Sequence, residues 1–233
     1  MAFAEPILII AFNRPDRVTA LIDRLREIQP VKLYVAVDGP RGHVAADAEK
    51  VERVKQALDE VDWPCELKTN FQGANLGCGM GVSTAIGWFF ANEVRGIVLE
   101  DDVMPTPGFF PFCAELLERY QDDERVFSIS GCNFVPPNEL TDPKASYRFS
   151  AITHVWGWAA WRRSWDAYEY DMANWRQRLP LKQRWRAMGG NLGGFIYWTA
   201  VYDWMRFGHL DTWDYQFSLT QMAEGSFAAT SNV

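Results

Sequence analysis

Cysteine is scarce in this 233-residue chain: Cys65, Cys78, Cys113 and Cys132 are the only four, and they are widely spaced. A zinc site or a disulfide framework would require close pairs such as C-x-x-C, so the sequence indicates neither. Reduced, unpaired cysteines are typical of a cytosolic protein. An excess of basic residues is also missing, because the formal net charge is −7. This charge argues against a nucleic-acid partner, but not against a nucleotide held through a bound cation.

Long hydrophobic runs are missing as well. The apolar stretch 7–12 has neither the basic region nor the small-residue cleavage site that flank the core of a signal peptide. It is also far shorter than the ~20 apolar residues of a transmembrane helix. The sequence therefore predicts a cytoplasmic protein without a transmembrane segment, for which peripheral membrane contact stays open.

The common glycine-rich nucleotide motifs do not occur. The run Gly77-Cys78-Gly79-Met80-Gly81 fits neither G-x-G-x-x-G nor the Walker pattern. Glycines before a helix allow a phosphate or a sugar to approach the backbone closely. They serve equally well for tight packing of a turn, and the sequence leaves both interpretations open.

What the chain does contain is an alternation of strand-like and helix-like segments in its first half. Strands are predicted at 6–12, 31–37, 66–68, 96–99 and, further on, 126–130. Apolar residues at helical spacing lie between the first four. Such alternation is typical of parallel strands joined by right-handed crossovers. We therefore expect an α/β fold of Rossmann-like, three-layer αβα architecture with a mostly parallel central sheet.

Three consecutive acids, Glu100-Asp101-Asp102, end the predicted strand 96–99. Adjacent carboxylates repel one another, so this is an unfavourable arrangement unless a cation lies there. Mg²⁺ and Mn²⁺ take oxygen ligands and commonly bridge carboxylates to substrate phosphates. Ligands of open α/β sheets also bind beyond the carboxyl ends of the strands. The alternative is a solvated turn; the remaining motifs favour a metal–nucleotide site.

The second half of the chain is rich in aromatic residues. Nine of the eleven tryptophans lie between Trp156 and Trp213. We expect most of them in the core, with one or two available to stack on a sugar ring. A helix capped by Asp211 or Thr212 and running to about Ala223 would carry Asp214 in its first turn. A carboxylate there is a candidate general base.

Five short motifs, taken in order, resemble GT-A-fold glycosyltransferases, in particular bacterial relatives of the N-acetylglucosaminyltransferase I type. They are Ala11-Phe12-Asn13-Arg14, Asp38-Gly39, Glu100-Asp101-Asp102, Trp156-Gly157-Trp158 and Trp213-Asp214. The acidic triplet is that family's form of the Asp-x-Asp motif. The resemblance covers nearly the whole chain and implies one GT-A domain over 1–233, with a nucleotide-binding half at about 1–103 and an acceptor-side half at about 104–233. It also implies that the natural protein continues past Val233.

The resemblance implies a role for each matching residue of the nucleotide-binding half. Arg14 and Asp38 would hold the nucleotide, with Asp38 facing the base. Glu100 would contact the donor sugar and Asp101 the ribose. Asp102 would be the single direct protein ligand of Mn²⁺ or Mg²⁺, and the diphosphate and water would supply the others.

In the acceptor-side half the resemblance implies three further roles. Trp158 would lie in the segment that lines the donor and acceptor side, and Trp213 next to the sugar. Asp214 would be the catalytic base. The implied activity is metal-dependent, inverting transfer of a hexosyl or N-acetylhexosaminyl group from a nucleotide-diphosphate donor, a UDP-sugar being favoured. The implied acceptor is a hydroxyl of a glycan or glycolipid in polysaccharide biosynthesis.

Other functions remain alternatives. A sugar-phosphate nucleotidyltransferase uses a similar sheet but needs a Gly-rich loop with Arg and Lys after the first strand, where this chain has Asn13-Arg14-Pro15-Asp16. A non-catalytic carbohydrate-binding domain would account for the tryptophans but not for the acidic strand end. A retaining transferase also stays open, because the stereochemistry depends on Asp214 alone.

Overall fold

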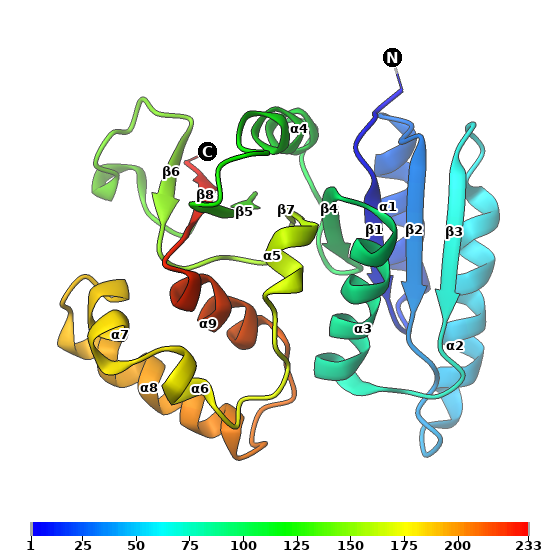
Figure 1. Ribbon diagram of the computed structural model, residues 1–233. Coiled ribbons are helices and arrows are strands. Elements are labelled where there is room, and N and C mark those ends of the chain that lie inside the picture. The colour runs from blue at the N-terminus through cyan, green and yellow to red at the C-terminus, as the bar shows by residue number, and fades with distance from the viewer. Residues whose placement is uncertain (1, 233) are drawn as a thin grey trace.

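Short apolar runs form the strands of one eight-stranded sheet in the computed structural model, which describes residues 2–232 (Figure 1). The strand order is β3-β2-β1-β4-β7-β5-β8-β6. The strands are β1 (Ile7–Ala11), β2 (Lys32–Val37), β3 (Glu66–Phe71), β4 (Arg95–Glu100), β5 (Val126–Ser130), β6 (Tyr147–Ser150), β7 (Trp158–Trp161) and β8 (Phe227–Ser231).

The first four strands form the parallel part of the sheet. β1 lies between β2 and β4, and β3 pairs with the outer side of β2. Ile10 of β1 is level with Ala36 of β2 and with Glu100 of β4. The carboxyl ends of these strands therefore meet at one edge of the sheet, which puts the residues that follow them side by side.

The second part of the sheet is mixed. β7 is inserted between β4 and β5 and is antiparallel to both, and β6 is antiparallel to β8. β5 and β8 are parallel. The predicted α/β fold is confirmed, but four parallel and three antiparallel pairings within residues 2–232 make this a mixed sheet. The four residues of β7, buried on both faces, gave no alternating pattern from which their direction could be predicted.

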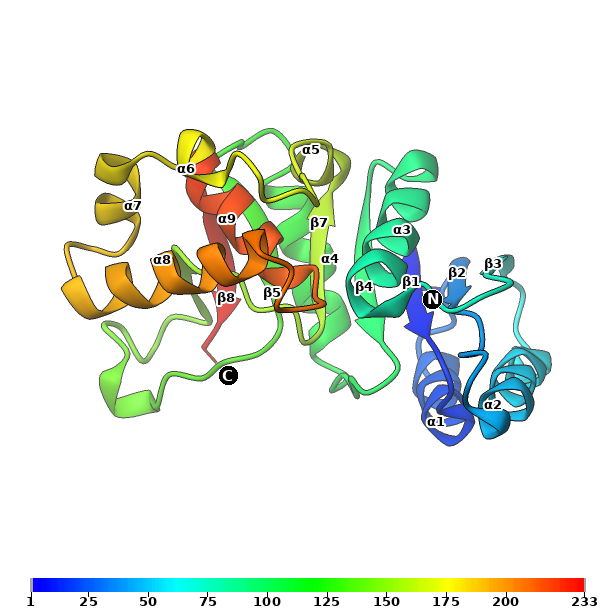
Figure 2. The same ribbon diagram turned by 90° about the horizontal axis from the view of Figure 1, so that it is seen from below.

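Helices cover both faces of the sheet (Figure 2). The helices are α1 (Pro15–Arg26), α2 (Ala45–Gln56), α3 (Gly77–Asn92), α4 (Phe109–Arg119), α5 (Arg162–Asp166), α6 (Trp175–Arg178), α7 (Leu181–Ala187), α8 (Leu192–Arg206) and α9 (Asp214–Glu224), with 3₁₀ turns at Ala57–Glu60 and Pro137–Glu139. Apolar residues of α1, α2 and α4 pack on one face. Residues of α3 and α9, with Trp165 of α5, pack on the other.

A third, smaller core lies beside the sheet. Side chains of α6 and α8 pack there against Leu219 and Met222 of α9. Five of the nine tryptophans from Trp156 onward are buried, while Trp156, Trp185 and Trp204 are exposed. Across residues 2–232, no helix combines the length and the apolar character that a bilayer crossing requires.

Candidate functional site

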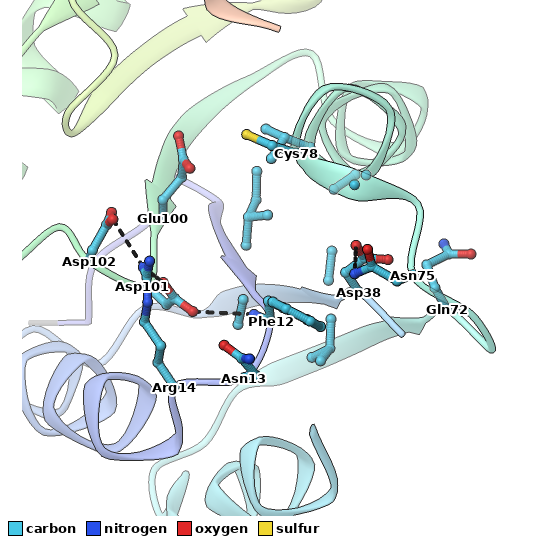
Figure 3. Close-up of a pocket in the computed structure, with 18 of the residues that line it drawn as sticks. Phe12, Asn13, Arg14, Asp38, Gln72, Asn75, Cys78, Glu100, Asp101 and Asp102 are labelled. Atoms are coloured by element: carbon cyan, nitrogen blue, oxygen red, sulfur yellow. Dashed lines mark hydrogen bonds and ion pairs between the residues drawn. The ribbon is translucent and has the colours of Figure 1, made fainter. Parts of the chain in front are cut away.

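A cavity of about 490 Å³ lies at the carboxyl ends of β1, β2 and β4, next to the start of α3 (Figure 3). Five of the residues predicted to act at a site line it: Arg14, Asp38, Glu100, Asp101 and Asp102. They come together because the parallel strands end at a common edge. The other three predicted residues, in the second half of the chain, do not belong to this lining.

Arg14 links the last two acids of the triplet. Its Nη1 donates to Asp101 Oδ1 at 2.8 Å and to Asp102 Oδ2 at 3.0 Å, and the Phe12 backbone N–H donates to Asp101 Oδ2 at 3.2 Å (Figure 3). Burial raises the pKa of Asp101, whereas the Phe12 N–H and Arg14 act in the opposite direction. Asp101 is 7% exposed and Asp102 50% exposed. Asp101 is thus an anchored carboxylate, and Asp102 is the acid that solvent or a ligand can reach.

Glu100 lies on the other face of β4, which is the face covered by α3 and α9. Burial raises its pKa to about 7, assisted by the negative charges of Asp102, Asp101 and Asp214, while a hydrogen bond from the Trp213 side chain lowers it. The end of β4 therefore holds more negative charge than its surroundings compensate. This donor set of carboxylate oxygens fits a hard divalent cation.

A complete protein metal cage is not part of this arrangement. Within residues 2–232, no group of three or more His, Cys, Asp or Glu side chains is placed to hold a metal ion. Mg²⁺ is usually bound through one or two carboxylates together with substrate phosphates and water. The half-exposed carboxylate of Asp102, at the mouth of the cavity, suits that mode of binding.

Asp38 occupies the opposite wall of the cavity and organises the loop before α3. Its carboxylate accepts hydrogen bonds from the Gly39 N–H at 2.8 Å, from the Leu76 N–H at 2.9 Å and from Asn75 Nδ2 at 2.8 Å. A carboxylate offers about four lone-pair sites, so three donors leave room for one more. Asp38 is therefore a structural residue of the loop that can still accept from a ligand.

The glycine run at the start of α3 packs against a distant segment. Asp211 accepts from the Cys78 N–H at 3.1 Å and from the Gly79 N–H at 2.9 Å. A Cβ on Gly79 would collide with this carboxylate and with the Tyr170 hydroxyl. The sequence left two interpretations of the glycine run open, close approach of a ligand and tight packing of a turn. The structure shows tight packing of Gly79 against Asp211 and Tyr170. The predicted role of Asp211 or Thr212 as the cap of α9 is wrong, because α9 has no side-chain cap and Asp211 caps α3 instead.

Among the polar residues of the lining for which the sequence indicated no role are Asn13 and Arg41. Both are held by buried Asp47, which accepts from Asn13 Nδ2 at 2.9 Å and from Arg41 Nε at 2.6 Å. The hydrogen bond from the Arg41 guanidinium is the main reason why the pKa of Asp47 lies well below its usual range. Burial raises this pKa, and the hydrogen bond from the Asn13 amide lowers it further. The Arg41 guanidinium lies 5.3 Å from the centroid of the Phe12 ring. An aspartate in the first turn of α2 resembles ordinary dipole compensation, so no local pattern marks this role.

The predicted aromatic residues of the second half lie in the core. Trp158 is 0% and Trp213 2% exposed, and their rings stack with centroids 5.6 Å apart. Trp158 therefore lies in the core, whereas the Trp213 side chain lies near enough to Glu100 to lower the pKa of that carboxyl. Asp214, the first residue of α9, accepts from the Thr212 hydroxyl and lies near enough to influence the pKa of Glu100.

Cys78 is the nucleophilic side chain of the cavity wall, and its surroundings keep it neutral. Burial raises its pKa to about 11, together with the charges of Glu100, Asp211, Asp214 and Asp102. A thiolate is the reactive form of cysteine. At neutral pH Cys78 is therefore a protonated thiol, and carboxylates dominate the chemistry of the cavity.

Comparisons with known proteins add no family assignment. A scan against profiles of known protein families and a search of curated proteins both gave no match.

Proposed function

We propose that this chain is a cytoplasmic, GT-A-type glycosyltransferase that binds a nucleotide-diphosphate sugar in the cavity at the ends of β1, β2 and β4. One observation carries the proposal: an arginine, Arg14, and an acidic strand end, Glu100 to Asp102, share a cavity with the loop-anchoring Asp38. Carboxylates, a guanidinium and open space at the carboxyl edge of a parallel sheet suit a metal–nucleotide complex.

The charges around the cavity suit a donor that arrives together with a divalent cation. Asp102 would hold that Mn²⁺ or Mg²⁺, which neutralises the charge that builds up on the diphosphate leaving group. Arg14, now paired with two acids, can turn towards phosphate oxygens, and Arg41 supplies a second cation held in place by Asp47. Without a cation, the acids at the end of β4 would repel a diphosphate.

The transfer step requires a base for the acceptor, and Asp214 is the candidate. It takes the proton of an acceptor hydroxyl while the hydroxyl oxygen forms a bond to the anomeric carbon. On the opposite face of the sugar, the bond from the anomeric carbon to the phosphate oxygen breaks, and the nucleoside diphosphate leaves with the electron pair. The configuration inverts, through a transition state of the oxocarbenium type. A UDP-sugar and the hydroxyl of a glycan or glycolipid are the proposed substrates.

Calorimetric titration tests the donor site directly. UDP, GDP and a panel of nucleotide sugars are titrated with and without Mn²⁺ into the wild type, into Asp102→Ala and into Asp122→Ala, an exposed acid outside the cavity lining. We expect Mn²⁺-dependent binding of one nucleotide class that Asp102→Ala weakens by tenfold or more, while Asp122→Ala binds as the wild type does. If no nucleotide binds in the presence of Mn²⁺, the proposal is wrong.

A further inference from the structure

The outer side of α8 is unusually apolar for a helix at the molecular surface. Its inner side packs into the third core through Trp198, Val201, Tyr202 and Met205. Its outer side carries four apolar residues, each between 58% and 67% exposed, at intervals of four, eight and three positions: Leu192, Ile196, Trp204 and, just after the helix, Phe207. A surface helix normally turns polar residues outward, and an apolar outer stripe indicates a second contact surface.

α7 extends this apolar surface. Leu181 and Trp185 are both exposed and, being four residues apart, lie on the same side of the helix. The Trp185 ring packs edge-on against Phe195 of α8 with centroids 5.8 Å apart. The exposed tryptophans and Tyr197 have rings with a polar group at one end, the type of side chain that prefers a boundary between water and lipid.

The charge of this region is opposite to that of the whole chain. Every charged residue between Asp171 and Asp203 is basic, although the net charge of the protein is −7: Arg176, Arg178, Lys182, Arg184 and Arg186. Of these, Arg184 is buried, and Arg176 and Arg178 pair with Asp203 of α8 and with Glu169. Within residues 2–232, Lys182, Arg186 and Arg206 have no carboxylate within ion-pair distance. Exposed aromatic and aliphatic side chains flanked by free Lys and Arg are the pattern of helices that lie in the interface of anionic membranes.

We propose that the face formed by α7 and α8 docks onto an anionic lipid bilayer, with α8 lying in the plane of the interface. A second copy of this chain is a poorer occupant, because a self-complementary contact would bring the cations of both copies together. The stripe along the 15 residues of α8 is about 22 Å long, enough for several lipid headgroups. This inference rests on the surface of α7 and α8 and does not depend on the proposed sugar transfer.

Docking on this face would also orient the cavity. In Figure 1, α8 and the carboxyl ends of β2 and β3 lie toward the lower side of the molecule, the side that Figure 2 presents to the viewer. The cavity at the ends of the parallel strands would then open near the membrane. A water-soluble ligand and a lipid-linked one could both reach such a site.

Sedimentation with large vesicles tests the proposal. The probes are vesicles of phosphatidylcholine alone and vesicles with roughly 30% phosphatidylserine, at about 0.1 M salt. We expect the protein to sediment with the anionic vesicles and to remain in solution with the neutral ones, and we expect added salt to release it. Equal binding to both vesicle types, or binding to neither, would overturn the proposal.

Paired substitutions separate this face from general charge effects. Lys182→Gln with Arg186→Gln should weaken binding to anionic vesicles by roughly 25-fold, since each cation near such a surface contributes about fivefold. Arg17→Gln with Lys50→Gln, exposed residues of α1 and α2, changes the net charge equally and should leave binding within about twofold. Equal losses in the two variants would exclude α7 as the contact.

The apolar stripe has its own pair of variants. Ile196→Ser with Trp204→Ser should abolish vesicle binding, whereas Val94→Ser, at a position 66% exposed on the turn before β4, should not. Circular dichroism checks that each variant is folded. If the Ile196→Ser, Trp204→Ser variant is not folded, the Lys182→Gln, Arg186→Gln variant tests the membrane contact instead. If the stripe variant binds vesicles normally but loses a concentration-dependent dimer in analytical ultracentrifugation, the stripe belongs to a second copy and the proposal fails.

Discussion

Asp214 is separated from the acidic strand end in sequence but lies near it in the fold. It begins α9, where the free backbone N–H groups of a helix N-terminus stabilise negative charge, and it accepts from the Thr212 hydroxyl. Its neighbour Trp213 lowers the pKa of Glu100. The first turn of α9 thus brings a carboxylate near Glu100, although Asp214 itself does not line the cavity.

We expect Asp214→Asn to bind the nucleotide-sugar donor as the wild type does and to lose transfer by about 10²- to 10⁴-fold, the usual contribution of a general base. Calorimetry measures the binding, and a coupled assay of released nucleoside diphosphate measures the transfer. Asp16→Asn is the matched control, because Asp16 is a first-turn aspartate of α1 that is 94% exposed. Undiminished transfer by the Asp214 variant would remove this residue from the mechanism.

Asp47 ties two cavity-lining residues to α2, and its effect on stability depends on pH. Its pKa in the folded protein is far below the value of about 3.9 for an unfolded aspartate. The ion pair with Arg41 therefore contributes fully above about pH 5, and the contribution is lost as the pH falls toward the folded-state pKa. The stability contribution has this pH dependence because Arg41 interacts more strongly with the charged form of Asp47 than with the protonated form.

Asp47→Asn should accordingly lower the melting temperature at pH 7 by roughly 2–4 °C, and the difference from the wild type should shrink below about pH 4. Thermal unfolding followed by circular dichroism from pH 7 to pH 3 measures both values. Asp59→Asn, at an exposed acid of the 3₁₀ turn that directly follows α2, should melt as the wild type does. A difference that stays constant over this range would show that the charge of Asp47 is not what stabilises the fold.

The residues that sequence reasoning placed together are those whose positions follow from strand order. Arg14, Asp101 and Asp102 meet because β1 and β4 are neighbouring parallel strands, and the ends of such strands share an edge. Asp47 and Asp211 bind partners that no local pattern marks, and for Asp211 the partner lies 133 residues away. Their roles required the folded chain.

At the scale of elements, Asp211 connects the start of α3 to the segment before α9. Its two oxygens accept from consecutive N–H groups of α3, Cys78 and Gly79, which have no partner inside their own helix. The contact joins the two halves of the chain across the cavity mouth, since Asp211 itself belongs to the lining. A helix cap supplied from so far along the chain stabilises the tertiary arrangement as well as the helix.

Asp211→Ala should lower the free energy of unfolding by about 1 kcal/mol, the typical value for losing a helix cap. Asp211→Asn should lose less, because the amide oxygen can still accept one of the two hydrogen bonds. Urea unfolding of both variants and of Asp122→Ala, an exposed acid elsewhere, gives the comparison. If alanine and asparagine are equally destabilising, the hydrogen bonds from α3 are not the cause.

The elements of the first half were predictable because their patterns are local. β1, β2, β4 and the helices between them follow from buried apolar runs and helical spacing. β7 and the helices α5 to α8 were not predicted, since nearly every second residue there is aromatic or small and no period stands out. The insertion of β7 between β4 and β5 depends on long-range packing, and it makes the sheet mixed.

At the scale of the whole molecule, the protein is a continuous sheet with a smaller helical unit attached to one side. Cores on both faces of the sheet hold it together, while α6, α7 and α8 share a third core that reaches the rest through α9. Units with fewer buried contacts open at lower free energy than the central strands. The helical unit that carries the apolar stripe should therefore open separately from the sheet.

Hydrogen exchange followed by mass spectrometry should find the amides of α8 less protected than those of β1 and β4. Leu219→Ala removes a buried side chain that joins α9 to the third core, at a cost of about 2–5 kcal/mol, and should speed exchange in α8 before it affects β1. Leu25→Ala, at an equally buried position of α1, should speed exchange in β1 before it affects α8, because Leu25 belongs to the core on the face of the sheet covered by α1. If both variants speed exchange equally in α8 and in β1, the protein opens as one cooperative unit. The helical unit would then have no separate motion with which to adapt to a membrane surface.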